Sequence, residues 1–229
     1  MKNFLKRYSH AWIIIAYTLI YIPWFMFLEK NVKNSYHIIH MAVDDIIPFC
    51  EYFIVPYLLW FFYIAATVIY FIFTNKSEYK KLCAFLITGM TVFLLVSTFY
   101  PNGATLRPTV FPHNNIFTRL VIQLYSTDTP TNIFPSIHVY NSLGCYFAIS
   151  TSEKLSKNKP VLISSFILTF SIILATMFLK QHSVFDVITA FALSTFMYFA
   201  IYVVDYNSIA ERTASSKVSQ RSLFRRNQA

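Results

Sequence analysis

Six apolar runs of nearly bilayer-spanning length constrain this chain more than any other feature. They lie at roughly residues 11–28, 53–73, 82–99, 135–152, 161–179 and 184–204. A transmembrane helix needs about 20 consecutive apolar residues, because the hydrocarbon core of a bilayer is about 30 Å thick. Inside lipid every backbone polar group must be satisfied within the protein, so such runs fold as helices. The sequence therefore predicts an all-α fold, a bundle of six transmembrane helices.

The composition argues against an ordinary soluble domain. Hydrophobic residues make up 56% of the chain and charged residues only 13%, whereas soluble domains average about 25% charged residues. We expect one membrane domain over residues 1–204, with its catalytic core at about 82–204, and a basic cytoplasmic tail over 205–229. The first run is interpreted as an uncleaved anchor, since no small-residue cleavage site follows it.

The basic residues indicate how the bundle is oriented. The chain has 19 Lys and Arg residues, and fourteen of them would lie on one side of the membrane. These fourteen lie before the first run, in the connections between the second and third and between the fourth and fifth runs, and in the tail. The other five lie in the remaining connections, on the opposite side. The positive-inside rule therefore places both termini in the cytoplasm. This topology, together with anionic lipid headgroups, accounts for the net charge of +9, so no nucleic-acid partner is implied. We expect a multi-pass protein of the plasma membrane, with the connection 100–134 on the extracytoplasmic side.

Two histidine motifs stand at the outer ends of predicted helices. Residues 135–138 read Pro-Ser-Ile-His, His182 is followed four positions later by Asp186, and an Arg-Pro pair begins at Arg107. Ionisable residues at a membrane boundary are costly unless they have partners, so their convergence indicates a site. Residues four apart on a helix share a face. We therefore expect Asp186 to orient one ring nitrogen of His182 and to leave the other nitrogen as a nucleophile.

His138 suits a different chemical role. Pro135 and Ser136 are typical of the first turn of a helix, where free backbone N–H groups bind an anion such as phosphate. A histidine one turn into that helix can protonate a leaving oxygen. Taken alone, His138 fits an amphipathic ring at the lipid headgroup level better. Its combination with His182 favours phosphoryl transfer.

A second His-x-x-x-Asp spacing occurs at His40 and Asp44. It lies in a predicted outer loop, with neither a second histidine motif nor an Arg-Pro pair beside it. Short motifs of this kind often occur by chance. We therefore interpret this segment as solvated, or as a lid, rather than as catalytic.

In combination, these motifs resemble the type 2 phosphatidate phosphatase superfamily, also called lipid phosphate phosphatases, whose fold is a six-helix membrane bundle. The family signature has a Lys seven positions before Arg-Pro, then Pro-Ser-Gly-His, then Ser-Arg with a His six positions after the Arg and an Asp four beyond it. Arg107, the 135–138 motif and the pair of His182 and Asp186 match in order. The resemblance covers roughly residues 44–204.

The chain departs from this signature at three positions. Tyr100 stands where the family has Lys, Ile137 replaces the Gly, and Thr176 stands where the family has Arg. Two of the usual phosphate-binding cations are therefore missing. Lys180 and Arg119 are the available substitutes, although neither stands at a motif position.

Part of the chain is similar to one branch of the superfamily, the sphingomyelin and inositol phosphorylceramide synthases. That branch keeps the His-His-Asp triad and varies the flanking cations. The resemblance lies in residues 182–191 and in the outer segment 44–49. This similarity points toward transfer of the phosphoryl-containing group to an alcohol. Transfer and hydrolysis both stay open.

The resemblance implies a double displacement that uses no metal and no other cofactor. His182 would attack phosphorus to form a phosphohistidine, Asp186 would stabilise its imidazolium, and His138 would protonate the departing lipid alkoxide. His138 would then take a proton from water, or from an acceptor alcohol. The phosphate oxygens are expected to be held by Arg107, Ser136, the N–H of Ile137 and Lys180.

The leading prediction is therefore a lipid phosphatase that acts on a lipid phosphate at the outer membrane face. Membrane lipids would surround the protein. The alternative is a lipid phosphotransferase of the sphingomyelin synthase type. Two weaker alternatives remain, a metal site built from the same His, His and Asp, and a transporter. Arg107 disfavours a bound cation, and the lack of a detectable inverted repeat disfavours transport.

Overall fold

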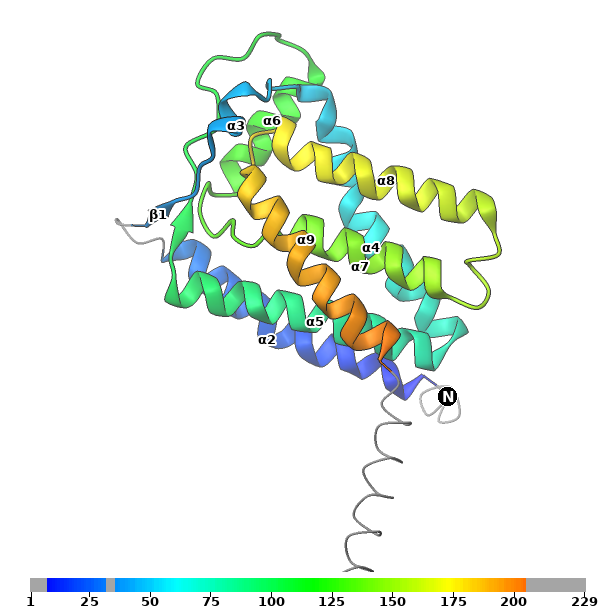
Figure 1. Cartoon of the computed structure of the whole chain (residues 1–229). Coiled ribbons are helices and arrows are strands. Elements are labelled where there is room, and N and C mark those ends of the chain that lie inside the picture. The colour runs from blue at the N-terminus through cyan, green and yellow to red at the C-terminus, as the bar shows by residue number, and fades with distance from the viewer. Residues whose placement is uncertain (1–7, 32–35, 205–229) are drawn as a thin grey trace, which may run out of the picture.

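The structure is a computed structural model, and it describes residues 8–31 and 36–204. The helices that run through the bundle are α2 (Trp12–Lys30), α4 (Ile54–Thr74), α5 (Lys76–Phe99), α7 (Ile137–Thr151), α8 (Lys159–Phe178) and α9 (Val184–Tyr198), as Figure 1 shows. A π-helical turn, Phe199–Val203, extends α9. The shorter elements are two 3-10 turns, Ser9–Ala11 and Glu51–Phe53, the helices α3 (Ala42–Ile46) and α6 (Ile116–Thr127), and a parallel pair of strands, β1 (His37–Ile38) and β2 (Asn102–Gly103).

Five helical segments of the described chain are long and apolar enough to cross a membrane. They are Ser9–Lys30, Glu51–Thr74, Lys76–Phe99, Lys159–Phe178 and Val184–Val203. They coincide with five of the six predicted spans and indicate an integral membrane protein. The sixth prediction falls on α7, which has 15 residues. At 1.5 Å per residue α7 is roughly 22 Å long, shorter than the hydrocarbon core, so a sixth crossing stays a prediction.

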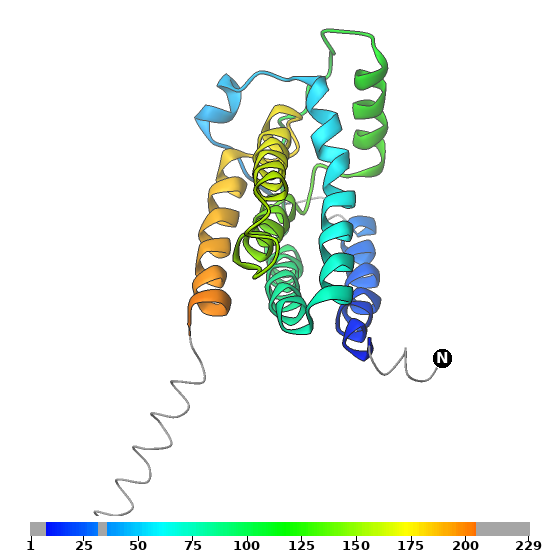
Figure 2. The same ribbon diagram turned by 90° about the vertical axis from the view of Figure 1, so that its right-hand side faces the viewer.

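The two ends of the bundle differ in structure (Figure 2). Helix α2 begins and helix α9 ends at one end, whereas α3 and α6 lie at the other, near the N-termini of α4 and α9. An even number of membrane passes would place the start of α2 and the end of α9 at the same end of the bundle. The side that faces the cytoplasm stays a prediction, and the predicted tail, residues 205–229, lies outside the described residues.

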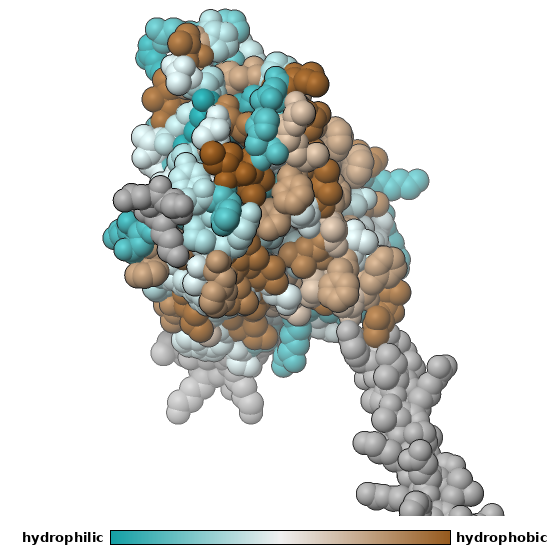
Figure 3. Space-filling view, turned by 60° about the vertical axis from the view of Figure 1, so that its left-hand side comes forward, coloured by the Kyte–Doolittle hydropathy of each residue, from teal (hydrophilic) through white to brown (hydrophobic). Residues whose placement is uncertain are grey.

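The flank of the bundle is apolar. Phe62 on α4 is 72% exposed, Leu19 on α2 is 69% exposed and Phe196 on α9 is 68% exposed. Figure 3 shows hydrophobic side chains over much of the face in view, with more hydrophilic ones toward the end that carries α3 and α6. So many large apolar side chains exposed on a helical surface are what a protein solvated by lipid presents.

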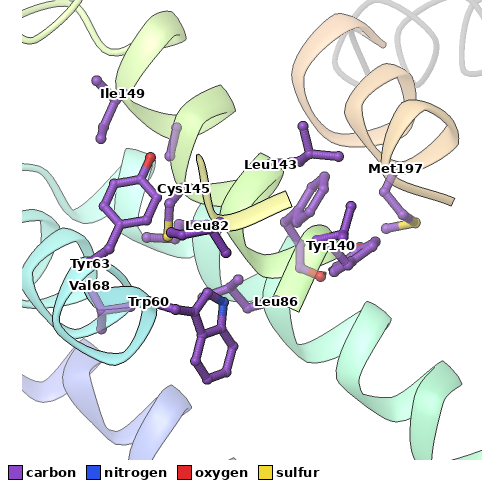
Figure 4. Close-up of a cluster of buried hydrophobic side chains, with 14 of the residues drawn as sticks. Trp60, Tyr63, Val68, Leu82, Leu86, Tyr140, Leu143, Cys145, Ile149 and Met197 are labelled. Carbon is purple, nitrogen blue, oxygen red and sulfur yellow. Dashed lines mark hydrogen bonds between the residues drawn. The ribbon is translucent and has the colours of Figure 1, made fainter. Parts of the chain in front are cut away.

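Helix α7 lies in the core and contacts α4, α5, α8 and α9. Figure 4 shows Tyr140 and Leu143 of α7 within the main buried cluster. A Cβ atom added to Gly89 of α5 would lie 2.0 Å from the Tyr140 ring, and one added to Gly144 of α7 would lie 2.5 Å from Phe85. Glycine at these two positions therefore lets α5 and α7 approach closely, as small residues do between membrane helices.

The predicted polar connection between residues 100 and 134 contains a helix that the sequence analysis missed. Asn115 caps α6, because its Oδ1 accepts a hydrogen bond from the backbone N of Thr118 at 2.9 Å. Val121 on the inner face of α6 is fully buried against a cluster that includes Tyr57 and Leu179. The connection 100–134 is thus a folded cover over the ends of α4 and α8.

Candidate active site

The first histidine motif forms the N-terminus of α7. Ser136 is fully buried and caps the helix, since its Oγ accepts a hydrogen bond from the Val139 N–H at 3.4 Å. His138 therefore lies in the first turn, as the motif predicts. The Ser136 N–H also points to the carbonyl oxygen of Asp186, at 3.5 Å. This contact brings the two histidine motifs together.

The second motif forms the N-terminus of α9. Ser183 is its N-cap, and the Oδ2 atom of Asp186 accepts a hydrogen bond from the Ser183 N–H at 2.9 Å, which completes a capping box. His182 therefore precedes the helix. The four-residue spacing had suggested a position inside the helix, and that expectation is wrong. The Nδ1 atom of His182 nevertheless lies 3.4 Å from Asp186 Oδ2, across the capping turn. Asp186 thus serves both the helix end and the imidazole.

The two histidines face each other. The Nε2 atom of His182 lies 3.4 Å from the Nδ1 atom of His138, and His182 is only 6% exposed. On its other side the His138 ring stacks on Tyr57, with ring centroids 4.6 Å apart, and it lies 4.4 Å from the Trp60 ring. Both aromatic residues belong to α4, so this helix fixes the His138 ring. The structure thereby assembles His138, His182 and Asp186 from two distant segments.

The two positions at which the family has cations contribute none here. The ring of Tyr100 stacks on His37 with centroids 4.2 Å apart, and the residue is 41% exposed. Thr176 is fully buried, and its hydroxyl donates to the carbonyl of Ile173 at 2.7 Å. The carbonyl of Thr176 accepts hydrogen bonds from the N–H groups of Gln181 and His182, both at 3.0 Å. Thr176 therefore shapes the turn before α9.

Arg107 lies in the connection 100–134, and groups of the protein hold its guanidinium. Its Nη1 donates to the carbonyl oxygens of Tyr125 at 3.3 Å and Asp128 at 2.8 Å, and its Nη2 donates to Gln181 Oε1 at 2.6 Å. The guanidinium also lies 4.4 Å from the Tyr125 ring centroid. Burial lowers the pKa of Arg107, and the negative charge of Asp128 opposes that shift. Burial raises the pKa of Asp128, and the positive charge of Arg107 opposes that shift.

Lys180 occupies the sharp turn between α8 and α9. Its φ of 54° is left-handed, a conformation that few residues other than glycine adopt. Its Nζ donates to the carbonyl oxygens of Asp44 and Ile47, so the ammonium is tied to the segment around α3. Burial lowers the pKa of Lys180, whereas the charge of Asp44 opposes that shift. Arg119, the other available cation, is exposed on α6.

Asp44 shows that the solvated interpretation of its segment is wrong for this residue. Asp44 is 2% exposed, and its carboxylate accepts hydrogen bonds from Ser183 Oγ at 2.6 Å and from the Val184 N–H at 2.8 Å. His40 instead pairs with Asp45, at 2.9 Å. The carboxylate therefore supports the N-terminus of α9 from outside the bundle, where the helix dipole favours a negative charge.

A small pocket opens on the histidine pair. His138, His182 and Gln181 line it, together with Glu29 of α2 and Asp128, the residue that follows α6. The Glu29 carboxylate accepts hydrogen bonds from two side chains of the connection 100–134, Thr129 Oγ1 at 2.5 Å and Asn132 Nδ2 at 2.8 Å. An adjoining pocket shares His138 and is lined mainly by apolar and aromatic side chains, among them Tyr21, Tyr57, Trp60, Phe61 and Leu124.

Several of these residues escaped the sequence analysis. Glu29 carried a usable signal, because an acidic residue at the end of an apolar run is costly without a purpose. Gln181 directly precedes His182, but a glutamine in a turn has no special meaning until its contacts are known. Tyr57, Trp60 and Asp128 reach the site only through tertiary packing. Among the described residues, no group of three or more His, Cys, Asp or Glu is placed to hold a metal ion.

The fold and the site define a class of protein, a helical membrane protein with a paired-histidine site at one end of its bundle. Residues 102–210 match the family model of the PAP2 superfamily. This match supports membership of that superfamily, which is a family of phosphatases and phosphotransferases. The matched segment contains Arg107 and both histidine motifs. No curated protein and no solved structure gives a significant match to the chain.

Proposed function

We propose that this protein is a membrane-embedded lipid phosphatase that hydrolyses a lipid phosphate monoester or pyrophosphate. The observation that carries the proposal is the approach of His182 Nε2 to His138 Nδ1, at 3.4 Å, with Asp186 beside the opposite nitrogen of His182. A nucleophile, a carboxylate that orients it and a separate acid are the parts that phosphoryl transfer through a covalent intermediate requires. The superfamily match supports the same reaction class.

In the first half of the reaction, His182 Nε2 attacks phosphorus and the bond from phosphorus to the lipid oxygen breaks. Asp186, near Nδ1, stabilises the positive charge that develops on the ring. His138 gives its proton to the leaving alkoxide, so the lipid departs as a neutral alcohol. For a pyrophosphate substrate, the same proton would go to the departing lipid monophosphate.

In the second half, His138 takes a proton from a water molecule, and the resulting hydroxide attacks the phosphohistidine. The phosphorus–nitrogen bond breaks, inorganic phosphate leaves, and His182 returns to its neutral form. If an acceptor alcohol replaced water, the same steps would produce a phosphate monoester of that alcohol, and a phosphodiester would form only from a donor that is itself a phosphodiester. The similarity of residues 182–191 to the sphingomyelin synthases keeps this transferase as the second candidate.

The surroundings of His138 support a lipid rather than a soluble substrate. The apolar pocket between α2, α4 and α6 adjoins the pocket that holds both histidines, and both pockets include His138. A substrate bound across them would place its phosphate at the histidines and its hydrocarbon beside aromatic rings. The distribution of Lys and Arg supports a site on the extracytoplasmic side of the membrane, and we propose the plasma membrane as its location.

Product analysis with purified protein tests the proposal. We would supply phosphatidate, phosphatidylglycerophosphate and a polyprenyl pyrophosphate in turn, with and without an acceptor alcohol, and use His182→Ala as the inactive control. Release of inorganic phosphate by the unchanged protein alone is the expected result. A new phosphate ester of the alcohol, formed only when the alcohol is present, would establish the transferase. Vesicle uptake of a substrate that is never cleaved would support a transporter.

A further inference from the structure

The side-chain amide of Gln181 is a polar group that the mechanism above leaves unused. Gln181 is 4% exposed and lines the same pocket as His138 and His182. Its Nε2 atom has no hydrogen-bond partner among the described residues. Native proteins satisfy nearly all buried donors, so a buried donor left unpaired beside a reactive pair indicates a group that the substrate pairs with.

Arg107 determines which end of this amide is left unpaired. The Gln181 side-chain atom that lies 2.6 Å from Arg107 Nη2 must be an acceptor, because a guanidinium only donates hydrogen bonds. That atom is therefore Oε1, and the end that remains free is the NH2 group. The assignment of oxygen and nitrogen in this glutamine follows from the chemistry of its partner, so the free end of Gln181 is a donor suited to an anionic oxygen.

The backbone fixes this donor relative to the nucleophile. The N–H groups of Gln181 and His182 both donate to the carbonyl oxygen of Thr176, at 3.0 Å each. The two side chains therefore leave the same anchored turn at adjacent positions. A phosphoryl group within reach of His182 would lie beside the Gln181 amide.

We propose that Gln181 Nε2 donates a hydrogen bond to a non-bridging oxygen of the substrate phosphate, and that Arg107 is a positioning residue that acts through Gln181. The inference rests on the proposed function and specifies how that site holds phosphate. Both Nη atoms of Arg107 are occupied by Gln181, Tyr125 and Asp128. Its Nε has no partner among the described residues, but Arg107 is not one of the residues that line the pocket.

This arrangement gives a physical reason for the sequence departures. A hydrogen bond from a cation to Oε1 polarises the amide and strengthens the donor at its other end. A neutral donor backed by a buried Arg107 thus takes over part of the work of the cations that Tyr100 and Thr176 do not supply. It also avoids placing a free positive charge beside Glu29 and Asp128, whose carboxylates would attract it away from the phosphate.

Gln181→Glu is the sharpest single test. Glutamate keeps the shape of the side chain and keeps an acceptor for Arg107, but it replaces the free NH2 group with an oxygen. Loss of one preorganised donor to a transition-state oxyanion typically costs about 10²- to 10³-fold in kcat. We expect a loss of this size for phosphatidate, or for the panel lipid with the fastest turnover, and a similar weakening of inhibition by orthovanadate. Gln123→Glu, the same change on the exposed face of α6, is the matched control.

A double-mutant cycle tests the role assigned to Arg107. Gln181→Leu removes the donor without burying a charge, and it also covers the case in which Gln181→Glu fails to fold. We expect Arg107→Met to lower kcat/KM by about tenfold or more in the unchanged chain and by less than about threefold in the Gln181→Leu chain, because coupled residues give non-additive effects. Equal losses in both chains would mean that Arg107 acts independently of Gln181 and would overturn the positioning role.

The outcomes separate this inference from the proposed function. If the unchanged protein cleaves a lipid phosphate and Gln181→Glu and Gln181→Leu both keep its kcat/KM within about threefold, the assignment of Gln181 is overturned and the phosphatase stands. If the unchanged protein cleaves none of the lipids and binds no vanadate, the proposed function falls and this inference falls with it.

Discussion

Removal of the Asp44 carboxylate should destabilise the end of the bundle that carries the histidines. Asp44 is 2% exposed and accepts three hydrogen bonds, from the Met41 N–H at 2.7 Å, from Ser183 Oγ at 2.6 Å and from the Val184 N–H at 2.8 Å. The last two join α3 to the start of α9. Asp44→Ala deletes both of these links and leaves their donors facing an apolar methyl group.

The size of the effect follows from these contacts. A hydrogen bond to a charged group contributes about 1.5 to 3 kcal/mol, and the two links are not independent, so we expect Asp44→Ala to lower the unfolding free energy by about 3 kcal/mol. For a chain of this length, each kcal/mol shifts the melting temperature by about 2 to 4 °C, which gives a decrease of roughly 6 to 12 °C. Thermal unfolding of the purified protein in detergent, followed by tryptophan fluorescence, measures it.

Asp45→Ala is the control for this experiment. Asp45 is the next residue along the chain, but its side chain is 67% exposed and pairs with the exposed His40. Exposed pairs add little stability, so its melting temperature should stay close to that of the unchanged protein. Equal melting temperatures for Asp44→Ala and Asp45→Ala would refute the conclusion that Asp44 anchors the start of α9.

Three further predictions concern catalysis and topology. His138→Ala should lower kcat by about 10²- to 10⁴-fold on a lipid phosphate and by less on an ester with an activated leaving group, which needs little protonation; equal losses on both esters would argue against an acid. The rate should pass through a maximum and fall on both sides as the pH is varied, because His182 must be neutral to attack while His138 must be protonated to donate, and EDTA should leave this profile unchanged. Activity lost to EDTA and restored by Zn²⁺ or Mg²⁺ would instead make the histidines metal ligands. A label near Asn114 should react in intact cells and a label near Asn158 only after permeabilisation. Reaction at both sites in intact cells would mean that the chain does not cross the membrane between them.

The long helices were predictable because lipid imposes a simple rule on sequence. Each needs an uninterrupted apolar run, so five of the predicted spans match long helices of the structure within a few residues. α6 was missed because its apolar residues serve only one face, where Val121 meets the ends of α4 and α8. α7 was identified as a helix, but its 15 residues are shorter than the apolar run suggested, since capping by Ser136 sets where it begins.

The site was predictable only where its chemistry lies in local motifs. His138, His182 and Asp186 stand at helix starts, and spacing alone related the last two. Gln181 and Asp44 gain their roles from partners distant in sequence, Arg107 and the start of α9. Distances of this kind depend on how the helices cross, which no local pattern encodes.

The covalent intermediate gives the most direct test of the central claim. The protein would be mixed briefly with a lipid phosphate in EDTA, quenched under alkaline conditions that preserve phosphohistidine, and analysed by mass spectrometry of its peptides. We predict one phosphoryl group on His182, none in His182→Ala, and a trapped intermediate in His138→Ala when the donor has an activated leaving group. Full turnover by His182→Ala, or a phosphoryl group on another residue that forms and decays as fast as turnover, would contradict the account.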